Sequence, residues 1–418
     1  MENKIEVYGH IMFLRDLGKV RFIILRTFSG IEQVVIKKGK VPNRVWEIFT
    51  SLGPEYFIKV KGTKVQSKIA KLGYEIIPEE IDIIAASKPL PIDLSEKVIA
   101  EFPTRIRFRY LDIRRPKVKA IFRVRATVVQ AAREFLVKRG FVELQLPIII
   151  GSASEGGAEL FQVKYFDRTA YLAQSGQLYK QSAIPAFGKV FTIGPSFRAE
   201  KSRTRKHLTE FWQIDVEEAL TTKDRLMQLQ FELVKYIYEK VNENNAEDLN
   251  TLGVKVEVPD YYHKIHYDEA IMILKNKGVS IEWGMDFGAD EERALCMEFD
   301  VPFFVTEFPE KEVAFYYKVM DEDPRLAHRI DFYGPGEYGV EWSSGGLREH
   351  DPVKLEKRMR DKGLNPASFD WYLDMFRYGF PPHGGFGLGV ERLMQTLLKL
   401  EKIHEAALYP RTPDILTP

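Results

Sequence analysis

A proline-rich stretch, Lys88-Pro89-Leu90-Pro91, divides this 418-residue chain into two parts whose residue patterns differ. Prolines interrupt regular secondary structure, so this stretch is typical of a linker. At about 150 residues per domain, the length is enough for two to three domains. We therefore predict a first domain over residues 1–87, a linker over residues 88–104 and a second domain over residues 105–418.

The first part shows short apolar runs separated by glycine-marked turns. The runs predict strands near residues 5–8, 19–25, 32–36, 56–60 and 75–77, and a helical pattern at 45–51 lies between the third and the fourth. Five strands with one helix in that place favour a small closed barrel of the OB type. A fragment of a β-sandwich is the alternative.

The second part mixes helices and strands without a βαβ rhythm. Residues 115–139 carry apolar side chains at helical spacing, and Gly140 stands where that helix would end. The pattern predicts an α+β domain on an antiparallel sheet and excludes a doubly wound nucleotide fold. A helix-rich stretch over residues 222–295 is predicted to be an insertion between strands of that sheet.

Composition limits the classes of partner and compartment. Only one cysteine is present, Cys296, so a reducing compartment is expected and any metal site must use oxygen or nitrogen ligands. The formal charge is +1, from 61 basic and 60 acidic residues, so contact with nucleic acid must come from local clusters. Without a long apolar run or a signal-peptide core, the chain is expected to be cytoplasmic, with no membrane partner.

A charged segment lies between two strand-like flanks in the second part. It begins at Phe197-Arg198-Ala199-Glu200, continues to His207 and ends before Phe211. An arginine on a strand suits a phosphate, because its planar fork donates to two oxygens, and an aromatic ring beside it can stack on a base. For residues 201–206 a solvated hairpin tip is the alternative.

A glycine-rich segment runs from Pro381 to Arg392. Its glycines allow a ligand or a neighbouring strand to approach closely, and Arg392 falls in the first turn of the predicted helix that follows. A guanidinium beside the free amides of a helix N-terminus is suited to a polyphosphate. The spacing matches neither a Walker loop nor a dinucleotide-binding fingerprint.

These two segments are similar to motifs 2 and 3 of class II aminoacyl-tRNA synthetases, and residues 115–147 resemble motif 1. Ser154-Glu155-Gly156-Gly157 and the run from Gln174 to Gln181 narrow the resemblance to archaeal-type aspartyl- and asparaginyl-tRNA synthetases of subclass IIb. The resemblance implies a multidomain fold with an N-terminal all-β OB-fold barrel and an α+β class II catalytic domain. It also implies a homodimer, since motif 1 builds the dimer interface in that class.

The resemblance implies a ligase that forms an aminoacyl-adenylate from ATP and transfers the amino acid to tRNA. Arg198 would bridge the α-phosphate and the substrate carboxylate, Arg392 would bind the γ-phosphate, and Phe211 would stack under adenine. Two further residues would border the nucleotide, Glu200 and His207. Mg²⁺ on the phosphates would be placed by Asp331, Glu341 and Ser344, and an ordinary surface carboxylate is the alternative for each of the two acids.

The same resemblance assigns the amino-acid pocket. The ammonium group and backbone of the substrate would be received by Glu155, Ser175, Gln177 and Gln213. Lys180 and Arg348 match two cations that clamp a β-carboxylate, with Asp215 orienting the lysine. Two cations around one carboxylate form charge-assisted hydrogen bonds, whereas an amide would leave donors unpaired. We therefore predict an aspartate–tRNA ligase.

Other segments resemble asparaginyl enzymes more closely, among them residues 200–208 and 334–339. An asparagine–tRNA ligase is therefore the main alternative. An asparagine synthetase derived from the same fold and a non-catalytic tRNA-binding paralogue are further alternatives. The predicted barrel argues against the asparagine synthetase. The presence of Arg198, Glu341 and Arg392 argues against the non-catalytic paralogue.

The expected partner of the barrel is the anticodon of tRNA-Asp, with tRNA-Asn as a second substrate of relaxed charging. The resemblance aligns Arg15, Phe22 and Gln33 with anticodon readers: Phe22 would stack on the central uridine and Gln33 would bond to its edge. The alternatives are a core position for Phe22 and an ordinary surface position for Gln33.

Overall fold

The chain forms two compact units in the computed structural model, Met1–Asp112 and Ile113–Pro418. The structure describes residues 3–95, 97–151, 160–200 and 207–418. Residues 105–112, which the sequence analysis assigned to the second domain, pack with the first unit. Arg105 Nε and Arg109 Nη1 donate to the two oxygens of Asp112, at 3.0 and 2.7 Å, and Leu111 packs with Ile92.

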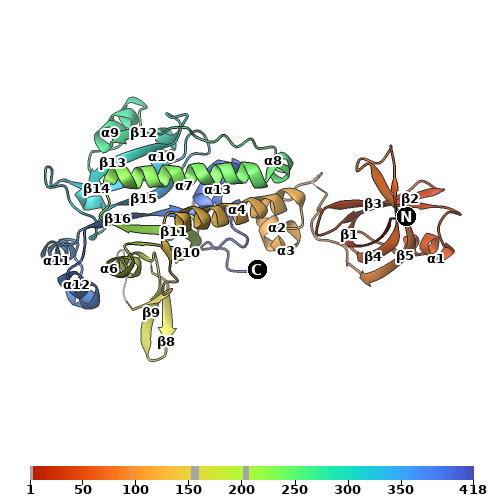
Figure 1. The fold of residues 1–418 in the computed structure, drawn as a ribbon, viewed down its shortest axis with the longest axis horizontal. Helices are drawn as coiled ribbons and strands as arrows, with labels where there is room; N and C mark the ends of the chain where they lie inside the picture. The colour runs from red at the N-terminus through yellow and green to blue at the C-terminus, as the bar shows by residue number, and fades with distance from the viewer. Residues whose placement is uncertain (1–2, 96, 152–159, 201–206) are drawn as a thin grey trace. The chain divides into compact units, whose positions relative to one another are not determined.

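The first unit is built on a closed ring of five strands (Figure 1), which hydrogen-bond in the order β1-β2-β3-β5-β4. The ring closes because β1 pairs antiparallel with both β2 and β4, while β3 meets β5 in parallel. Its interior is filled by aliphatic side chains such as Ile23, Val34 and Ile58. The elements are β1 (Lys4–Asp16), β2 (Val20–Arg26), β3 (Ile31–Lys37), α1 (Asn43–Ile48), β4 (Phe57–Gln66), β5 (Tyr74–Ala85), α2 (Phe102–Arg107) and α3 (Arg109–Asp112).

The second unit is organised around an eight-stranded sheet in the order β12-β13-β14-β15-β16-β11-β10-β6. Its six inner strands are antiparallel as predicted, but β12 pairs with β13 and β6 pairs with β10 in parallel. The sheet is therefore mixed. Long connections reach both edges, through α9 and α10 on one side, and such crossovers, unlike hairpins, join parallel strands.

The strands of this sheet are β6 (Val142–Glu143), β10 (Lys189–Phe197), β11 (Glu210–Ala219), β12 (His263–His266), β13 (Phe303–Pro309), β14 (Leu326–Tyr333), β15 (Glu341–Leu347) and β16 (His383–Gly389). A separate three-stranded sheet contains β7 (Ile149–Ile150), β8 (Gln162–Tyr165) and β9 (Arg168–Leu172).

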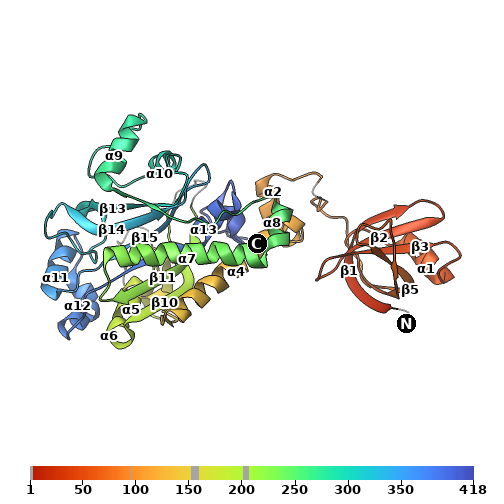
Figure 2. The same cartoon turned by 45° about the horizontal axis from the view of Figure 1, so that its top comes forward.

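One face of the large sheet is covered by α4 (Pro116–Lys138), α7 (Lys223–Asn244) and α13 (Val390–Leu398). The two long helices α4 and α7 lie side by side in both views (Figures 1 and 2). Helix α4 begins at Pro116, where the missing N–H costs nothing, and ends before Gly140, whose φ of 81° is left-handed. Its buried stripe, which includes Val124 and Val128, faces the core, as the apolar spacing predicted.

The other face carries a second core and shorter helices. These are α5 (Gln177–Ser182), α6 (Ile184–Phe187), α9 (Tyr267–Asn276), α10 (Ala289–Cys296), α11 (Pro352–Asp361) and α12 (Asp370–Arg377); α8 (Ala246–Leu252) follows α7 on the first face. The stretch 222–295, predicted as a helical insertion, is helix-rich but also contributes strand β12 to the sheet. The candidate site lies on this second face.

Candidate active site

Strand β11 sends alternate side chains to opposite faces of the sheet. Ile214 and Val216 point into the core beneath α4 and α7, so Gln213, Asp215 and Glu217 point to the second face. The glycine-rich strand β16 lies beside them and makes room for the carboxylates.

Two glycines of β16 are required by this close approach. Gly387 pairs with Asp215, and a Cβ at residue 387 would lie 2.7 Å from Asp215 Oδ1. A Cβ at Gly385 would collide with the Glu217 carboxylate and the Val216 carbonyl. The glycine-rich segment therefore serves the neighbouring acids of β11 directly, as the prediction of a close strand approach implied.

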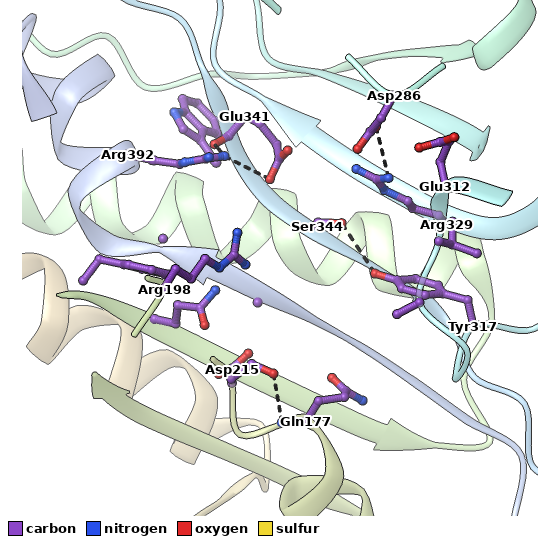
Figure 3. Close-up of a pocket in the computed structure, with 18 of the residues that line it drawn as sticks. Gln177, Arg198, Asp215, Asp286, Glu312, Tyr317, Arg329, Glu341, Ser344 and Arg392 are labelled. Carbon is purple, nitrogen blue, oxygen red and sulfur yellow. Dashed lines mark hydrogen bonds and ion pairs between the residues drawn. The ribbon is translucent and has the colours of Figure 1, made fainter. Parts of the chain in front are cut away.

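A cavity of about 610 Å³ opens on this face, and Figure 3 shows its walls. Twelve side chains singled out by the sequence analysis line it together: Ser175, Gln177, Arg198, Glu200, His207, Phe211, Gln213, Asp215, Glu341, Ser344, Arg348 and Arg392. Lys180 and Asp331 lie behind the wall instead. Glu155 and residues 201–206 fall outside the described residues.

One end of the cavity carries arginine, aromatic and acidic side chains in succession. The Arg198 guanidinium carbon lies 5.4 Å from the centre of the Phe211 ring, and its Nη1 lies 3.8 Å from Glu200 Oε1. His207 Nε2 lies 3.8 Å from the other oxygen of Glu200. A ring flanked by a guanidinium provides a platform for a base with a cation beside it for a phosphate.

A second arginine faces the same space from the first turn of α13. Arg392 Nη1 donates to the Glu341 carbonyl oxygen and approaches Glu341 Oε1, at 3.1 Å in both cases (Figure 3). Ser344, on the same strand as Glu341, lies with its hydroxyl 3.5 Å from that of Tyr317. Two arginines and a carboxylate thus converge on the cavity, which suits a polyanion with a hard cation.

Asp331 is placed differently from the other acids. It is fully buried, and Arg329 holds both of its oxygens, Nε to Oδ1 at 3.0 Å and Nη2 to Oδ2 at 2.7 Å. Arg329 also reaches Asp286 at 3.2 Å. This geometry does not match the metal-ligand role that the resemblance implies for Asp331. Within the described part of the chain, no three acidic, histidine or cysteine side chains are arranged to hold a metal.

A buried cluster of two cations and two carboxylates lies at the floor of the cavity, where Asp215 and Arg348 line it and Lys180 and Glu217 lie behind them. Lys180 Nζ lies 3.3 Å from Asp215 Oδ1 and 3.4 Å from Glu217 Oε2, and its side chain is only 1% exposed. Arg348 Nε donates to Glu217 Oε1 at 3.0 Å. Burial raises the pKa of Glu217, but Arg348 and Lys180 outweigh burial and hold that pKa below its ordinary value. The four charges therefore cancel.

One donor of the Arg348 guanidinium is left available to a ligand. Its Nη2 donates to Gln177 Oε1 at 3.3 Å and to the Gly385 carbonyl at 3.0 Å, but its buried Nη1 has no partner among the described residues. The rings of Tyr316 and Tyr317 lie against the guanidinium, with their centres 5.2 and 4.7 Å from Arg348 Cζ. A buried donor without a partner is costly, so an acceptor supplied by a ligand would relieve that cost.

A chain of hydrogen bonds supports this floor from behind. The Tyr372 hydroxyl donates to Gln181 Oε1 at 2.8 Å, and Gln181 Nε2 lies 2.7 Å from His383 Nε2. His383 Nδ1 faces the Pro381 carbonyl at 3.0 Å, so Nδ1 carries the proton and Nε2 accepts. Burial lowers the pKa of His383 to about 4, and the ring is therefore neutral near pH 7.

Sequence reasoning missed Glu217, Arg329 and Asp286. The first two had a signal, because each lies two residues from a predicted site residue and so shares its strand face. Asp286 had none, since the loop that carries it reaches the cavity only through the tertiary fold.

The three predicted anticodon readers share the outer surface of the barrel. Arg15 of β1 is the cross-strand partner of Phe22 of β2. Gln33 of β3 is the partner of Ile24, which lies two residues after Phe22 on β2 and so on the same face. Ile23, next to Phe22, points inward, so Phe22 is not a core residue. The alternative that placed it in the core is therefore excluded.

A further hollow lies along the surface of α4. Its walls include Phe122, Val129, Trp212, Leu408 and Tyr409 together with Arg125 and Arg133. Trp212 is 40% exposed and Leu408 is 44% exposed, so apolar surface is left open here. Helix α4 belongs to the segment, residues 115–147, that resembles motif 1.

Comparison with known proteins identifies the family of this chain. A sequence profile of the family described as tRNA synthetases class II (D, K and N) matches residues 101–413. The chain belongs to this family. As a class II aminoacyl-tRNA ligase, it is 42% identical to an aspartate–tRNA(Asp) ligase of Pyrococcus abyssi, over 99% of this chain and 96% of that protein.

The similarity of this synthetase is divided between two amino acids. It is 44% identical to an asparagine–tRNA ligase of Pyrococcus horikoshii, again over 99% of this chain and 96% of that protein. A crystal structure of asparaginyl-tRNA synthetase from Pyrococcus horikoshii complexed with asparaginyl-adenylate aligns with a TM-score of 0.95 at 42% identity, covering 100% of this chain and 96% of that one. Overall similarity thus leaves aspartate and asparagine open.

Among the described residues, no helix has the length and apolar character to cross a bilayer.

Proposed function

We propose that this synthetase is an ATP-dependent aspartate–tRNA ligase. The observation that carries the proposal is the buried pair of Lys180 and Arg348 at the cavity floor, with one Arg348 donor still open. A carboxylate placed there would accept from Nη1 and sit within the field of both cations. The side chain of aspartate ends in such a carboxylate.

The remaining substrate contacts follow from the cavity walls. Ser175, Gln177 and Gln213 would receive the ammonium and carboxylate of the amino acid, with Asp215 beside them. Glu155 remains a proposed contact from its resemblance alone. Arg198 would bridge the α-phosphate and the substrate carboxylate, which would bring the attacking oxygen to phosphorus. Catalysis would then rest on positioning and charge stabilisation.

The nucleotide would lie along the arginine-lined end of the cavity. Phe211 would stack under adenine, Glu200 and His207 would border it, and Arg392 would bind the γ-phosphate. Glu341 and Ser344 line the same wall and offer oxygen ligands of the kind Mg²⁺ prefers. The ion would neutralise charge on the phosphates when bound.

Asparagine is the second candidate, and one observation favours it. Asp215 and Glu217 already compensate the charges of Lys180 and Arg348, so the floor carries no net positive charge for a carboxylate. A carboxamide oxygen could also accept from Arg348 Nη1. The amide nitrogen would then need an acceptor, and Asp215, a carboxylate of the same cluster, lines the cavity.

The barrel supports a tRNA partner. Its five-stranded ring with a helix between β3 and β4 suits an OB fold, and Arg15, Phe22 and Gln33 form one outer surface of charge, ring and amide. Such surfaces bind single strands. We propose that this surface reads the anticodon of tRNA-Asp, and that the apolar hollow along α4 is the homodimer contact. A monomer in sedimentation of the full chain would contradict the dimer.

The proposal is tested by charging of tRNA with the purified full chain. We expect labelled aspartate to become attached to tRNA-Asp in the presence of ATP and Mg²⁺. Release of asparagine from aspartate, ATP and ammonia without charged tRNA would indicate the asparagine synthetase instead. Binding of tRNA without any ATP consumption would indicate the non-catalytic paralogue.

A further inference from the structure

Arg329 forms an ion cluster with Asp331 and Asp286 in the wall of the cavity. Its guanidinium meets Asp331 through two parallel hydrogen bonds and meets Asp286 through the third nitrogen, at 3.2 Å. The ring of Phe308 lies 4.3 Å from its carbon. An arginine side chain is not deprotonated in proteins near neutral pH. The guanidinium is therefore a permanent charge.

The two acids predicted to place Mg²⁺ differ in their access to it. A magnesium ligand must approach the ion to about 2.0–2.1 Å in octahedral geometry. Arg329 donates to both Asp331 oxygens, its positive charge would repel a metal ion there, and Asp331 does not line the cavity. Glu341 does line the cavity, and Arg392 contacts its side chain at Oε1.

We propose that Arg329 is the resident counter-ion of Asp331, and that the metal of the nucleotide is bound on this wall through Glu341 and not through Asp331. The inference rests on the proposed ATP-dependent function. It also gives the loop before α10 a role, because the pair of Arg329 and Asp286 ties that loop to the wall of the cavity (Figure 3). Arg329 thereby acts as a positioning residue.

The test is Mn²⁺ binding to the full chain with saturating ATP and no amino acid, followed by electron paramagnetic resonance. We expect Glu341→Gln to weaken Mn²⁺ binding by about tenfold or more, in the range of lost metal-site partners. Asp331→Asn should weaken Mn²⁺ binding much less than Glu341→Gln does, since the aspartate is not a ligand. An equal loss in both variants would overturn the inference.

A second measurement protects against a fold defect in Asp331→Asn. Thermal unfolding in EDTA should show a lower Tm for this variant, because Arg329 loses its buried partner. If Asp331 were instead a vacant ligand repelled by Glu341, its neutralisation would raise the Tm. The matched control is Asp323→Asn, which breaks an exposed pair with Arg325 and should leave Mn²⁺ binding unchanged.

The double variant Arg329→Met with Asp331→Asn removes both charges at once and leaves no buried ion unpaired. We expect Mn²⁺ affinity close to that of the wild type, and loss of binding in this variant would overturn the inference. ATP that fails to bind to the wild-type chain would refute the proposed function itself. Bound ATP with Mn²⁺ lost only in Asp331→Asn would refute the inference alone.

Discussion

Lys180 and Arg348 bind opposite oxygens of one buried carboxylate, that of Glu217. Lys180 Nζ lies 3.4 Å from Oε2 and Arg348 Nε lies 3.0 Å from Oε1. Both cations are thus held in place before any substrate enters, by a group that belongs to the sheet. A fixed pair of this kind spares the substrate the cost of ordering two long side chains.

Removal of the ammonium should abolish amino-acid activation. We expect Lys180→Met to lose aspartate-dependent ATP–pyrophosphate exchange while ATP still binds, because Lys180 lies behind the floor and away from the nucleotide end. The variant should also lose about 3–5 kcal/mol of stability, since two buried carboxylates lose a partner. Calorimetric ATP binding and denaturant unfolding measure the two effects.

The control for this variant is Lys189→Met, the same exchange at an ion pair whose lysine is 38% exposed. It should cost less than about 1 kcal/mol and leave exchange unchanged. Near wild-type exchange in Lys180→Met would show that Lys180 does not read the substrate.

Arg348 should matter through its donors and not only its charge. Arg348→Lys keeps a cation but removes the open Nη1 and the contacts to Gln177 and Gly385. We expect the KM for the amino acid to rise by about tenfold or more, with the KM for ATP unchanged, because Lys and Arg are not equivalent at such sites. Steady-state exchange measures both constants.

The matched exchange Arg325→Lys, at an arginine that is 71% exposed, should alter neither constant. An unchanged amino-acid KM in Arg348→Lys would exclude a donor role for the guanidinium.

His383 should make the fold sensitive to acid. Its pKa of about 4 lies below the ordinary 6.5, so the unfolded chain binds the proton more readily. The stabilisation is therefore complete above pH 6.5 and is lost as the pH falls from 6.5 through 4, amounting to roughly 3 kcal/mol. We expect Tm to fall less in His383→Asn than in the wild type when the pH is lowered from about 7.5 to about 4.5, a range that covers most of this window.

The barrel surface should contribute to tRNA binding through Phe22. Phe22→Ala should weaken tRNA-Asp binding by about 1–3 kcal/mol, the usual cost of one stacked base. Phe28→Ala is the control, because Phe28 is 79% exposed in the turn between β2 and β3, away from the row of Arg15 and Phe22. Filter binding of labelled tRNA compares them, and equal losses would place the contact elsewhere.

Local pattern predicted much of this fold. The stripe of α4, its end before Gly140 and the two strands that flank the charged segment are set by residues close in sequence, and each was confirmed. The parallel edges of the large sheet were not predicted, because they depend on the path of long connections.

The candidate site was predicted less by physics than by resemblance. Twelve of its residues do line one cavity, but spacing alone would not have grouped Ser175 with Arg392. The hydrogen bonds from Arg329 to Asp331 depend on the rotamers of both side chains in the folded core, and no sequence pattern predicts them. Nor does any motif show that Glu217 joins the two cations.

The central claim is that the floor of the cavity selects a carboxylate, and the ratio of kcat/KM for aspartate over asparagine in ATP–pyrophosphate exchange tests it most directly. The account predicts a ratio of about 100 or more in favour of aspartate, within reach of a site that pairs polar groups. A ratio below one, with asparagine the better substrate, would contradict it.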